Sequence, residues 1–449
     1  MSSRQGGKCD NRSGSVRIPP HSRFQFEGEL DRVSHYLFRY PAKFHPPIAR
    51  TLLAKYTRAG DVVLDPFCGS GTLLVEASVL GRSSIGIDVD PVAAGVARAK
   101  IHRFQLPRLR ESVARLLRAL DRYKRDQKEY ERRKFVDLSL SRYESQVAKV
   151  RKQVPAITNL FHWFRRYVVV DLARIRHTIE HLAMPESHRD LFRIVFASII
   201  RNSSNADPVP VSGLEVTAHM KKRDADGRIV DPFLLFERAL KRALIGCETF
   251  NDKAGADVSS KIFCADATEL DRCLSKKVQA VITSPPYHGA VDYYRRHMLE
   301  MFWLGYTKTK DDRLALLENY VGRPAVPARH PLVQAELKTE LAKQWEKKIR
   351  KVSAARANAF HHYIAAMSKF FDVLSRHLSP KAPVILIVGH STWNKARIPT
   401  TQLFAELAGD NFELRKVFSY PVKNRYMSYS RHNNANINRE YILEFRPHN

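Results

Sequence analysis

Residues 61–81 read DVVLDPFCGSGTLLVEASVLG. A short apolar strand at 61–65 leads into a tight turn that contains two glycines. An apolar helix at 72–80 follows and ends before Gly81. A strand joined to a helix by such a turn is the first half of a β-α-β unit, and successive units of this kind build a parallel sheet. This stretch therefore predicts an α/β fold.

The alternation of strands and helices continues on both sides of this stretch. Pro46 begins a helical pattern upstream, which suits proline in a first helical turn. Residues 84–89 form a second strand, and Pro91 begins the next helix. Five further strands are predicted, at 261–264, 278–283, 383–388, 412–419 and 440–446.

Two polar segments interrupt the alternation. Residues 105–255 are mainly helical in pattern and rich in Arg and Lys, which predicts a large basic helical insertion. Residues 305–355 predict a second, smaller helical insertion. Residues 1–34 are polar and predict a flexible basic tail. The α/β domain is then expected to comprise residues 35–104 and 256–449.

The charge balance restricts the partners. The chain has 75 Lys and Arg against 46 Asp and Glu, a net charge of +29. Such an excess repels itself unless a polyanion neutralises it, so we expect a nucleic-acid partner. No apolar run approaches the ~20 residues that a membrane span needs. No signal peptide is recognised either, so we expect a protein of the bacterial or archaeal cytoplasm that does not bind membranes.

The cysteines predict neither disulfides nor a metal site. The chain has five of them. Their spacing is wide and includes no C-x-x-C pair, whereas zinc sites and disulfide frameworks have regular spacings. We therefore expect free thiols and no metal.

Two features beside the first strands indicate a nucleoside ligand. The glycines at 69 and 71 allow the backbone to approach a ligand at a helix N-terminus, although an ordinary tight turn has the same composition. Asp88 ends the second strand, where a carboxylate can accept both ribose hydroxyls. Asp90 is better placed to cap the helix at Pro91. Asp266 follows the third strand and is either an adenine acceptor or a turn residue.

The segment Thr283–Tyr287 (TSPPY) lies at a strand end. Its two prolines fix the backbone and remove two N–H donors. A base amino group is a poor nucleophile, because its lone pair is conjugated with the ring. Ser284 and the Pro285 carbonyl could accept its two protons, and Tyr287 could stack on a base removed from the duplex. The alternative interpretation is a proline-stiffened strand edge.

Taken together, DPFCGSGT (65–72), GIDVDP (86–91) and TSPPY (283–287) resemble the DNA amino-methyltransferases, the group that methylates cytosine at N4 or adenine at N6. Residues 40–47 (YPAKFHPP) are similar to an additional motif of that family before the glycine turn. Residues 291–305 (VDYYRRHMLEMFWLG) look like the N4-cytosine branch, which usually carries the SPPY form.

The resemblance implies a Rossmann-like class I methyltransferase sheet, with seven strands, an antiparallel last strand, and S-adenosylmethionine across the carboxyl ends of the strands. It implies that the cofactor is bound by Phe44, Asp65, Phe67, Gly69, Gly71, Thr72, Asp88, Asp266 and Ala267. It implies that the target base is held by Ser284, Pro285, Pro286 and Tyr287. On this basis Gly71→Arg should abolish cofactor binding while the fold survives.

The implied activity is direct methyl transfer to N4 of a flipped cytosine in double-stranded DNA, as part of restriction–modification and with a cognate restriction endonuclease as a further partner. Residues 105–255 and the loop 423–439 are two candidates for reading the DNA sequence, although the family usually places recognition after the catalytic motif when the glycine motif comes first. The alternatives are an N6-adenine enzyme, a tRNA or rRNA base methyltransferase, and a non-catalytic DNA-binding subunit. The serine of SPPY and the shortness of the segment before residue 35 disfavour the RNA enzymes.

Overall fold

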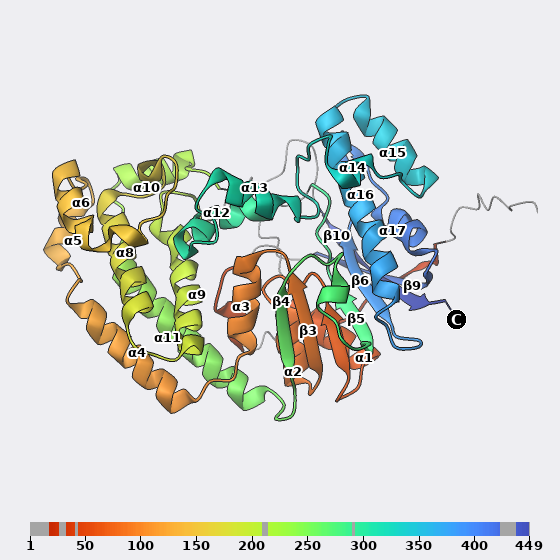
Figure 1. The fold of residues 1–449 in the computed structure, drawn as a ribbon, viewed down its shortest axis with the longest axis horizontal. Coiled ribbons are helices and arrows are strands. Elements are labelled where there is room, and N and C mark those ends of the chain that lie inside the picture. The colour runs from red at the N-terminus through yellow and green to blue at the C-terminus, as the bar shows by residue number, and fades with distance from the viewer. Residues whose placement is uncertain are drawn as a thin grey trace, which may run out of the picture.

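A twisted sheet forms the centre of the molecule (Figure 1). The computed structural model describes residues 18–26, 33–40, 44–208, 214–289, 292–422 and 437–448. Eight strands pair in the order β1-β9-β10-β6-β5-β2-β3-β4. Their bounds are β1 (His21–Arg23), β2 (Val62–Asp65), β3 (Ser83–Asp88), β4 (Ser260–Cys264), β5 (Ala280–Thr283), β6 (Val384–Gly389), β9 (Phe412–Pro421) and β10 (Arg439–Pro447). A separate two-stranded sheet pairs β7 (Thr392–Trp393) with β8 (Ala396–Arg397).

The strand directions confirm the predicted Rossmann-like α/β class. Strands β4, β3, β2, β5 and β6 are consecutive parallel neighbours. The last strand, β10, runs antiparallel between β6 and β9. All seven strands expected from the sequence are present. Parallel strands have their carboxyl ends at one edge of the sheet, and this edge is where ligands of such folds bind.

Strand β1 differs from the sequence prediction of a tail through residue 34. His21–Arg23 pairs in parallel with β9 and adds an eighth strand at the sheet edge. Phe24 is buried and contacts the rings of Phe418 and Tyr420. The flexible-tail prediction is therefore wrong for residues 18–26.

Helices cover both faces of the sheet. Helices α1 (Pro46–Tyr56) and α2 (Thr72–Val79) pack on one face, and α16 (Ala354–Ser375) and α17 (Thr400–Ala408) pack on the other. Successive strand residues serve opposite faces, because Ile385 and Ile387 of β6 belong to the first core and Leu386 and Val388 belong to the second. A strand buried on both faces explains the unbroken apolar run that the sequence shows there.

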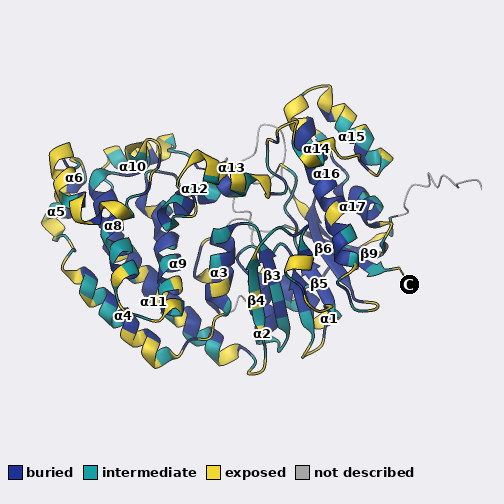
Figure 2. Ribbon diagram, viewed as in Figure 1, coloured by how far each residue is buried: buried dark blue, intermediate teal, exposed yellow. Residues whose placement is uncertain are grey.

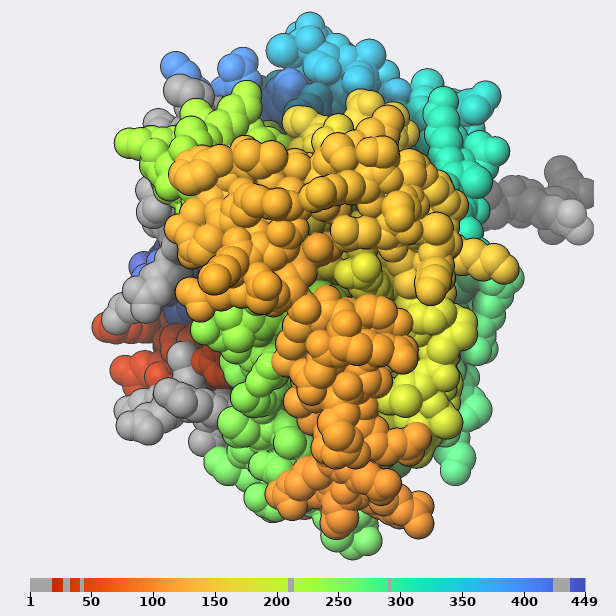
Figure 3. Space-filling view, turned by 90° about the vertical axis from the view of Figure 1, so that its left-hand side faces the viewer, coloured from red at the N-terminus to blue at the C-terminus, as the bar shows by residue number. Residues whose placement is uncertain are grey.

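The insertion forms a layer of helices beside the sheet, which we call the helical layer (residues 106–253). Its outer side faces the viewer in Figure 3. The helices are α4 (Leu106–Asp121), α5 (Gln127–Arg133), α6 (Leu140–Val147), α7 (Leu160–Trp163), α8 (Arg166–His181), α9 (Glu186–Ser203), α10 (Ala218–Ala225) and α11 (Pro232–Lys253). Buried residues lie along their inward faces and exposed residues along their outward faces (Figure 2).

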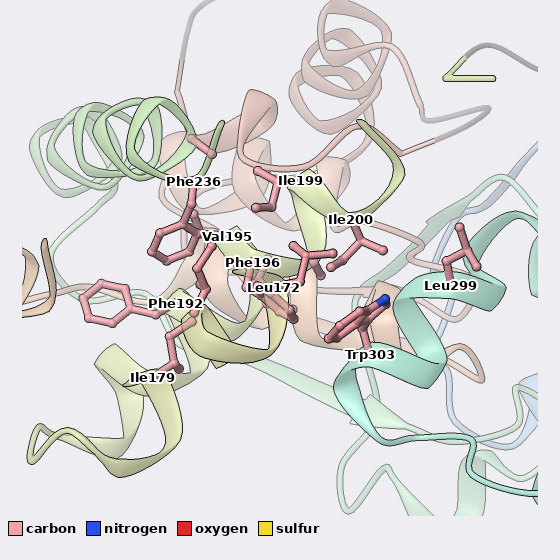
Figure 4. Packing of buried hydrophobic residues seen from close by; sticks show 14 of the residues in the cluster. Leu172, Ile179, Phe192, Val195, Phe196, Ile199, Ile200, Phe236, Leu299 and Trp303 are labelled. Atoms are coloured by element: carbon pink, nitrogen blue, oxygen red, sulfur yellow. The ribbon is translucent and has the colours of Figure 1, made fainter. Parts of the chain in front are cut away.

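The helical layer shares its core with the α/β domain. Helix α12 (Tyr293–Leu304) sends Leu299 and Trp303 into the apolar cluster of the layer (Figure 4). The Trp303 ring lies edge-on to Phe164 and Phe196, with ring centroids 5.7 and 5.8 Å away. Helix α3 (Pro91–Ile101) joins the same cluster. The layer and the sheet are therefore one packed structure rather than two independent units.

The remaining helices are short or lie near the carboxyl edge of the sheet. They are α13 (Lys310–Glu318), α14 (Pro331–Gln334), α15 (Glu340–Arg350) and the 3-10 helices at Ser34–Tyr36, Ala148–Gln153 and Leu270–Arg272. Within the described ranges, no helix is both long and apolar enough to cross a bilayer.

Candidate functional site

A cavity opens at the carboxyl ends of β2, β3, β4 and β5. Its empty volume, which includes the solvent space at its open mouth, is about 820 Å³. Ten residues predicted from the sequence line it: Phe44, Asp65, Phe67, Gly69, Thr72, Asp88, Asp266, Ala267, Ser284 and Pro286. Three predicted residues, Gly71, Pro285 and Tyr287, are not part of its lining.

The turn after β2 shapes one wall of the cavity. Gly69 has φ +49°, in the left-handed region that favours glycine. Its backbone N–H donates to the Asp88 carboxylate at 2.8 Å. A Cβ atom on Gly69 would lie 3.1 Å from the Tyr40 ring. The turn thus joins β2 to β3 and leaves little room for a side chain beside Tyr40.

Gly71 has a structural reason to be glycine that the sequence does not reveal. Its φ is +73°, and a Cβ there would lie 2.8 Å from the Cβ of Ala97 in α3. The absence of a side chain therefore lets α2 pack closely on α3. The expectation that Gly71→Arg would spare the fold is wrong, because any larger side chain must separate these two helices.

Two carboxylates, the buried Asp65 and the partly buried Asp88, face the cavity and form no ion pair with Lys or Arg of the described residues. Within the described residues, neither Asp65 nor Asp88 has a Lys or Arg within 4.0 Å, the limit for an ion pair. Burial raises the pKa of Asp65 to about 7, and the Asp88 charge adds to the effect. Burial and the neighbouring Asp90 raise the pKa of Asp88 to about 7 as well. Both groups are in an environment that favours a donor or a positive charge.

The other two acids have local structural roles. Asp90 caps α3, because one carboxylate oxygen accepts from the N–H groups of Val92 and Ala93 at 2.8 and 3.0 Å. Its second oxygen lies 2.7 Å from His297 Nδ1 on α12, and this contact raises the pKa of His297 against the effect of burial. Asp266 accepts from the Thr268 N–H at 2.8 Å, so it is a turn residue that also lines the cavity.

The SPPY motif lies at the end of β5 beside the glycine turn. Thr283, the last residue of β5, donates its hydroxyl to Asp65 at 2.6 Å and so ties the end of β5 to the end of β2. The Ser284 hydroxyl lines the cavity and donates to the Ile387 carbonyl of β6 at 3.3 Å. Hydrogen bonds to both neighbouring strands therefore fix the start of the motif.

Tyr287 is held by residues far along the chain. Its hydroxyl donates to Glu440 of β10 at 2.9 Å, and the Tyr420 hydroxyl donates to the other oxygen of the same carboxylate. A Cβ on Gly389 would lie 3.0 Å from the Tyr287 ring, so the glycine at the end of β6 makes room for this ring. Glu440 and Tyr420 belong to no local motif, so no sequence pattern indicates their role.

Several aromatic residues of the cavity were also not selected. Tyr40 and Tyr293 line it, and their rings stack with centroids 6.4 Å apart and an interplanar angle of 22°. Both belong to segments that resemble motifs of the family, although the resemblance implies no role for either residue. Tyr320 reaches the cavity from the second insertion, where nothing in the local sequence marks it. Most of the candidate recognition loop, residues 423–436, lies outside the described residues.

A family model described as DNA methylase, N6_N4_Mtase, matches residues 11–98. The chain is 29% identical over 122 residues to the type II methyltransferase M.MjaII of Methanocaldococcus jannaschii, which is 27% of this chain and 23% of that protein. It is 21% identical over 444 residues to the type II methyltransferase M.BsoBI of Geobacillus stearothermophilus, covering 89% of this chain and 82% of that protein.

A shorter match is to the tRNA (guanine(10)-N2)-dimethyltransferase of Methanothermobacter thermautotrophicus, at 43% identity over 54 residues, 12% of this chain and 16% of that protein. The type II methyltransferase match extends over most of both chains, whereas the match to the tRNA enzyme is confined to a short segment. The chain is therefore similar to the DNA amino-methyltransferases, in agreement with the resemblance of its motifs.

Proposed function

We propose that this protein is an S-adenosylmethionine-dependent DNA methyltransferase that methylates the exocyclic N4 amine of cytosine in double-stranded DNA. The observation that carries the proposal is the convergence of three distant motifs on one cavity. The glycine turn, Asp88 and Ser284 all line it, although more than 200 residues of sequence separate the first from the last. The similarity to type II methyltransferases supports DNA as the substrate and a role in restriction–modification beside a cognate endonuclease.

The cavity residues fit S-adenosylmethionine. The cofactor presents ribose hydroxyls as donors and carries positive charge on its sulfonium and ammonium groups. Asp65 and Asp88 have raised pKa values and form no ion pair with Lys or Arg of the described residues, so they are suited to such groups. Asp266 offers an acceptor to the adenine amino group, and Phe67 offers an apolar wall. When bound, the cofactor supplies an electrophilic methyl group, so the protein needs to position and activate only the nucleophile.

Ser284 and Pro285 are assigned to that activation. Because proline residues follow Ser284, the motif presents carbonyl acceptors without competing N–H donors. The Ser284 oxygen and the Pro285 carbonyl would accept the two protons of the amine and direct its lone pair into the cavity. Pro286 and the anchored ring of Tyr287 would limit the positions of the flipped base. Adenine at N6 is the closest alternative, because the same groups could hold its amine.

The test is a tritiated-methyl transfer assay on plasmid DNA and on bulk tRNA, followed by nucleoside mass spectrometry. N4-methylcytosine in DNA is the expected product. N6-methyladenine in DNA would keep the cofactor and the mechanism but change the base. Label in tRNA alone would replace the proposal by an RNA activity, which the 43% identical segment of a tRNA enzyme makes worth including. No label in either substrate would contradict the enzymatic proposal.

A further inference from the structure

Arg323 lies beside the SPPY motif but belongs to the second insertion. Tyr320 and Val321, just before it, line the cavity. Gly322 follows with φ +81°, and a Cβ there would lie 3.4 Å from the Cβ of Pro286 and 3.5 Å from the carbonyl oxygen of Tyr287. The backbone that carries Arg323 is therefore in direct contact with the residues proposed to hold the target base.

The guanidinium of Arg323 is only partly paired. Its Nη1 donates to the Leu317 carbonyl at 2.7 Å. Its Nε and Nη2 atoms are buried and have no hydrogen-bond partner among the described residues. Burial lowers the pKa of Arg323 and Glu318 raises it, yet no carboxylate in the described part of the chain lies within 4.0 Å of the group. Two N–H donors of a permanent cation are thus withdrawn from water without an acceptor.

These two donors are the ones that recognise an oxyanion. Nε and Nη2 lie on one edge of the planar guanidinium, and this edge donates two parallel hydrogen bonds to two oxygens of a carboxylate or a phosphate. The third group, Nη1, is already fixed by a backbone carbonyl, which holds the plane of the guanidinium. The protein therefore orients the guanidinium and leaves the edge that can bind an oxyanion without a partner among the described residues.

Two histidines lie close to this guanidinium. His362 of α16 is only 2% exposed, and its Nδ1 has no hydrogen-bond partner among the described residues. Its ring centroid is 4.6 Å from that of His330, which caps α14 by accepting from the Leu332 N–H at 3.2 Å. Burial, Arg323 and His330 together lower the pKa of His362 to about 3. An anion would accept hydrogen bonds from the unpaired donors of Arg323 and would reduce the positive potential at His362.

We propose that Arg323 and His362 bind a backbone phosphate of the DNA strand that carries the target base. This proposal rests on the proposed function, because the phosphate belongs to the DNA that the protein is proposed to methylate. The contact of Gly322 with Pro286 and Tyr287 places the site next to the flipped nucleotide, and the net charge of +29 favours a polyanion over a small carboxylate. A phosphate held there would fix the backbone on one side of the flipped base.

The experiment compares Arg323→Gln and Arg323→Lys with the intact chain. A duplex taken from a plasmid region that the wild type methylates is titrated by fluorescence anisotropy over a salt series. Arg323→Gln should weaken binding about tenfold and reduce the slope of log K against log salt by about 0.9, the value for one lost phosphate contact. Arg323→Lys should restore the slope but only part of the affinity, because a lysine cannot form the paired contact.

The matched control is Arg58→Gln. Arg58 is exposed and precedes β2, at the opposite edge of the sheet from the cavity. The Arg58→Gln variant should change the affinity for the duplex less than twofold. The melting temperature separates binding from a structural role, since removal of an uncompensated buried cation should leave it unchanged or raise it. A drop in melting temperature with an unchanged DNA slope would overturn the assignment. His362→Gln gives a second measurement and should also weaken DNA binding.

The two proposals can fail separately. An active wild type whose Arg323→Gln variant binds DNA with unchanged affinity and slope would overturn the phosphate site alone. A wild type that transfers no methyl group to DNA would overturn the proposed function, and the phosphate site with it. S-adenosylmethionine affinity, measured by calorimetry, should be the same in all variants, because Arg323 does not line the cavity.

Discussion

The helical layer and the cavity treat buried charge in opposite ways. In the layer, buried Arg side chains have carboxylate partners, as in Arg125 with Asp171 at 3.0 Å and Arg228 with Asp224 at 2.6 Å. At the cavity, the buried Asp65 and the partly buried Asp88 accept hydrogen bonds from a hydroxyl and from backbone N–H groups of the described residues. These arginines of the layer are paired within the protein, whereas the two cavity carboxylates have no cationic side chain of the described residues beside them and can be paired by a ligand.

This difference separates residues needed for folding from residues needed for activity. A group whose partner is internal contributes to stability, and its loss leaves the partner uncompensated. A group whose partner is a ligand adds little to the stability of the free protein and can even reduce it. Single substitutions that each remove one of these side chains test the comparison, with the free energy of unfolding and the activity measured on the same variants.

The largest effect is expected for Arg125→Met in the helical layer. Arg125 donates to both oxygens of the fully buried Asp171, at 3.0 Å each. Its removal should lower the free energy of unfolding by about 3 kcal/mol, because an uncompensated carboxylate stays behind. Arg174, 3.6 Å from the same carboxylate, keeps the loss from being larger. Chemical denaturation measures the loss in free energy of unfolding. The double variant Arg125→Met/Asp171→Leu should regain much of the stability. Equal stability of the single variant and wild type would refute the comparison.

Ser284→Ala should show the reverse pattern. Turnover should fall about 100-fold, because the amine loses an acceptor in the transition state. The free energy of unfolding should change by about 1 kcal/mol or less, since only a hydrogen bond to the Ile387 carbonyl is lost. Methyl transfer and denaturation are measured together, with Ser375→Ala on α16 as a matched control. Full activity would remove Ser284 from the mechanism.

Asp65→Asn should stabilise the protein in alkaline solution. The pKa of Asp65 is raised to about 7 in the folded state, above its ordinary value of 3.8. The folded state therefore holds the proton more tightly, and stability falls as pH rises between about 4 and 7. Asparagine keeps an acceptor for Thr283 and carries no charge, so the variant should exceed wild type by about 4 kcal/mol at pH 8 and match it near pH 4.

Part of this pH dependence should remain in Asp65→Asn, because Asp88 titrates in the same range. Melting curves at a series of pH values would measure the difference between variant and wild type. A constant difference from pH 4 to pH 8 would show that Asp65 is ionised throughout and would contradict the description of the cavity as a site of unpaired charge.

The smallest effect is expected for Glu440→Gln. The Glu440 carboxylate accepts from both Tyr287 and Tyr420, and glutamine offers only one acceptor oxygen. Turnover should fall several-fold, about 1 kcal/mol, because the Tyr287 ring is held less firmly. S-adenosylmethionine affinity should not change. Glu444→Gln is the matched control, since Glu444 lies on the same strand and accepts from Tyr56 at 2.7 Å. Equal losses in both variants would indicate a general effect on β10.

The sheet could be predicted because its strands are buried on both faces and read as apolar runs bounded by turn residues. Strand β1 could not, because the three residues HSR are exposed and form no apolar run. Ten of the residues that line the cavity could be predicted, because they belong to the motifs that resemble the family. Tyr320 did not, since the folding of the second insertion, rather than any local pattern, brings it to the cavity. Gly71 shows a different limit, because a glycine required for helix packing looks the same as one required for a ligand.

The position of Trp303 in the core of the helical layer has a consequence for synthesis on the ribosome. Phe164 and Phe196 leave the ribosome before the tryptophan that covers them, which follows Phe196 by roughly a hundred residues and thus by about 5–20 s of elongation. During that interval the nascent layer exposes an apolar surface that its own helices do not cover. Correct completion of the layer therefore depends on the segment that directly follows the SPPY motif, and a ribosome that pauses between these points would hold the chain in an aggregation-prone state.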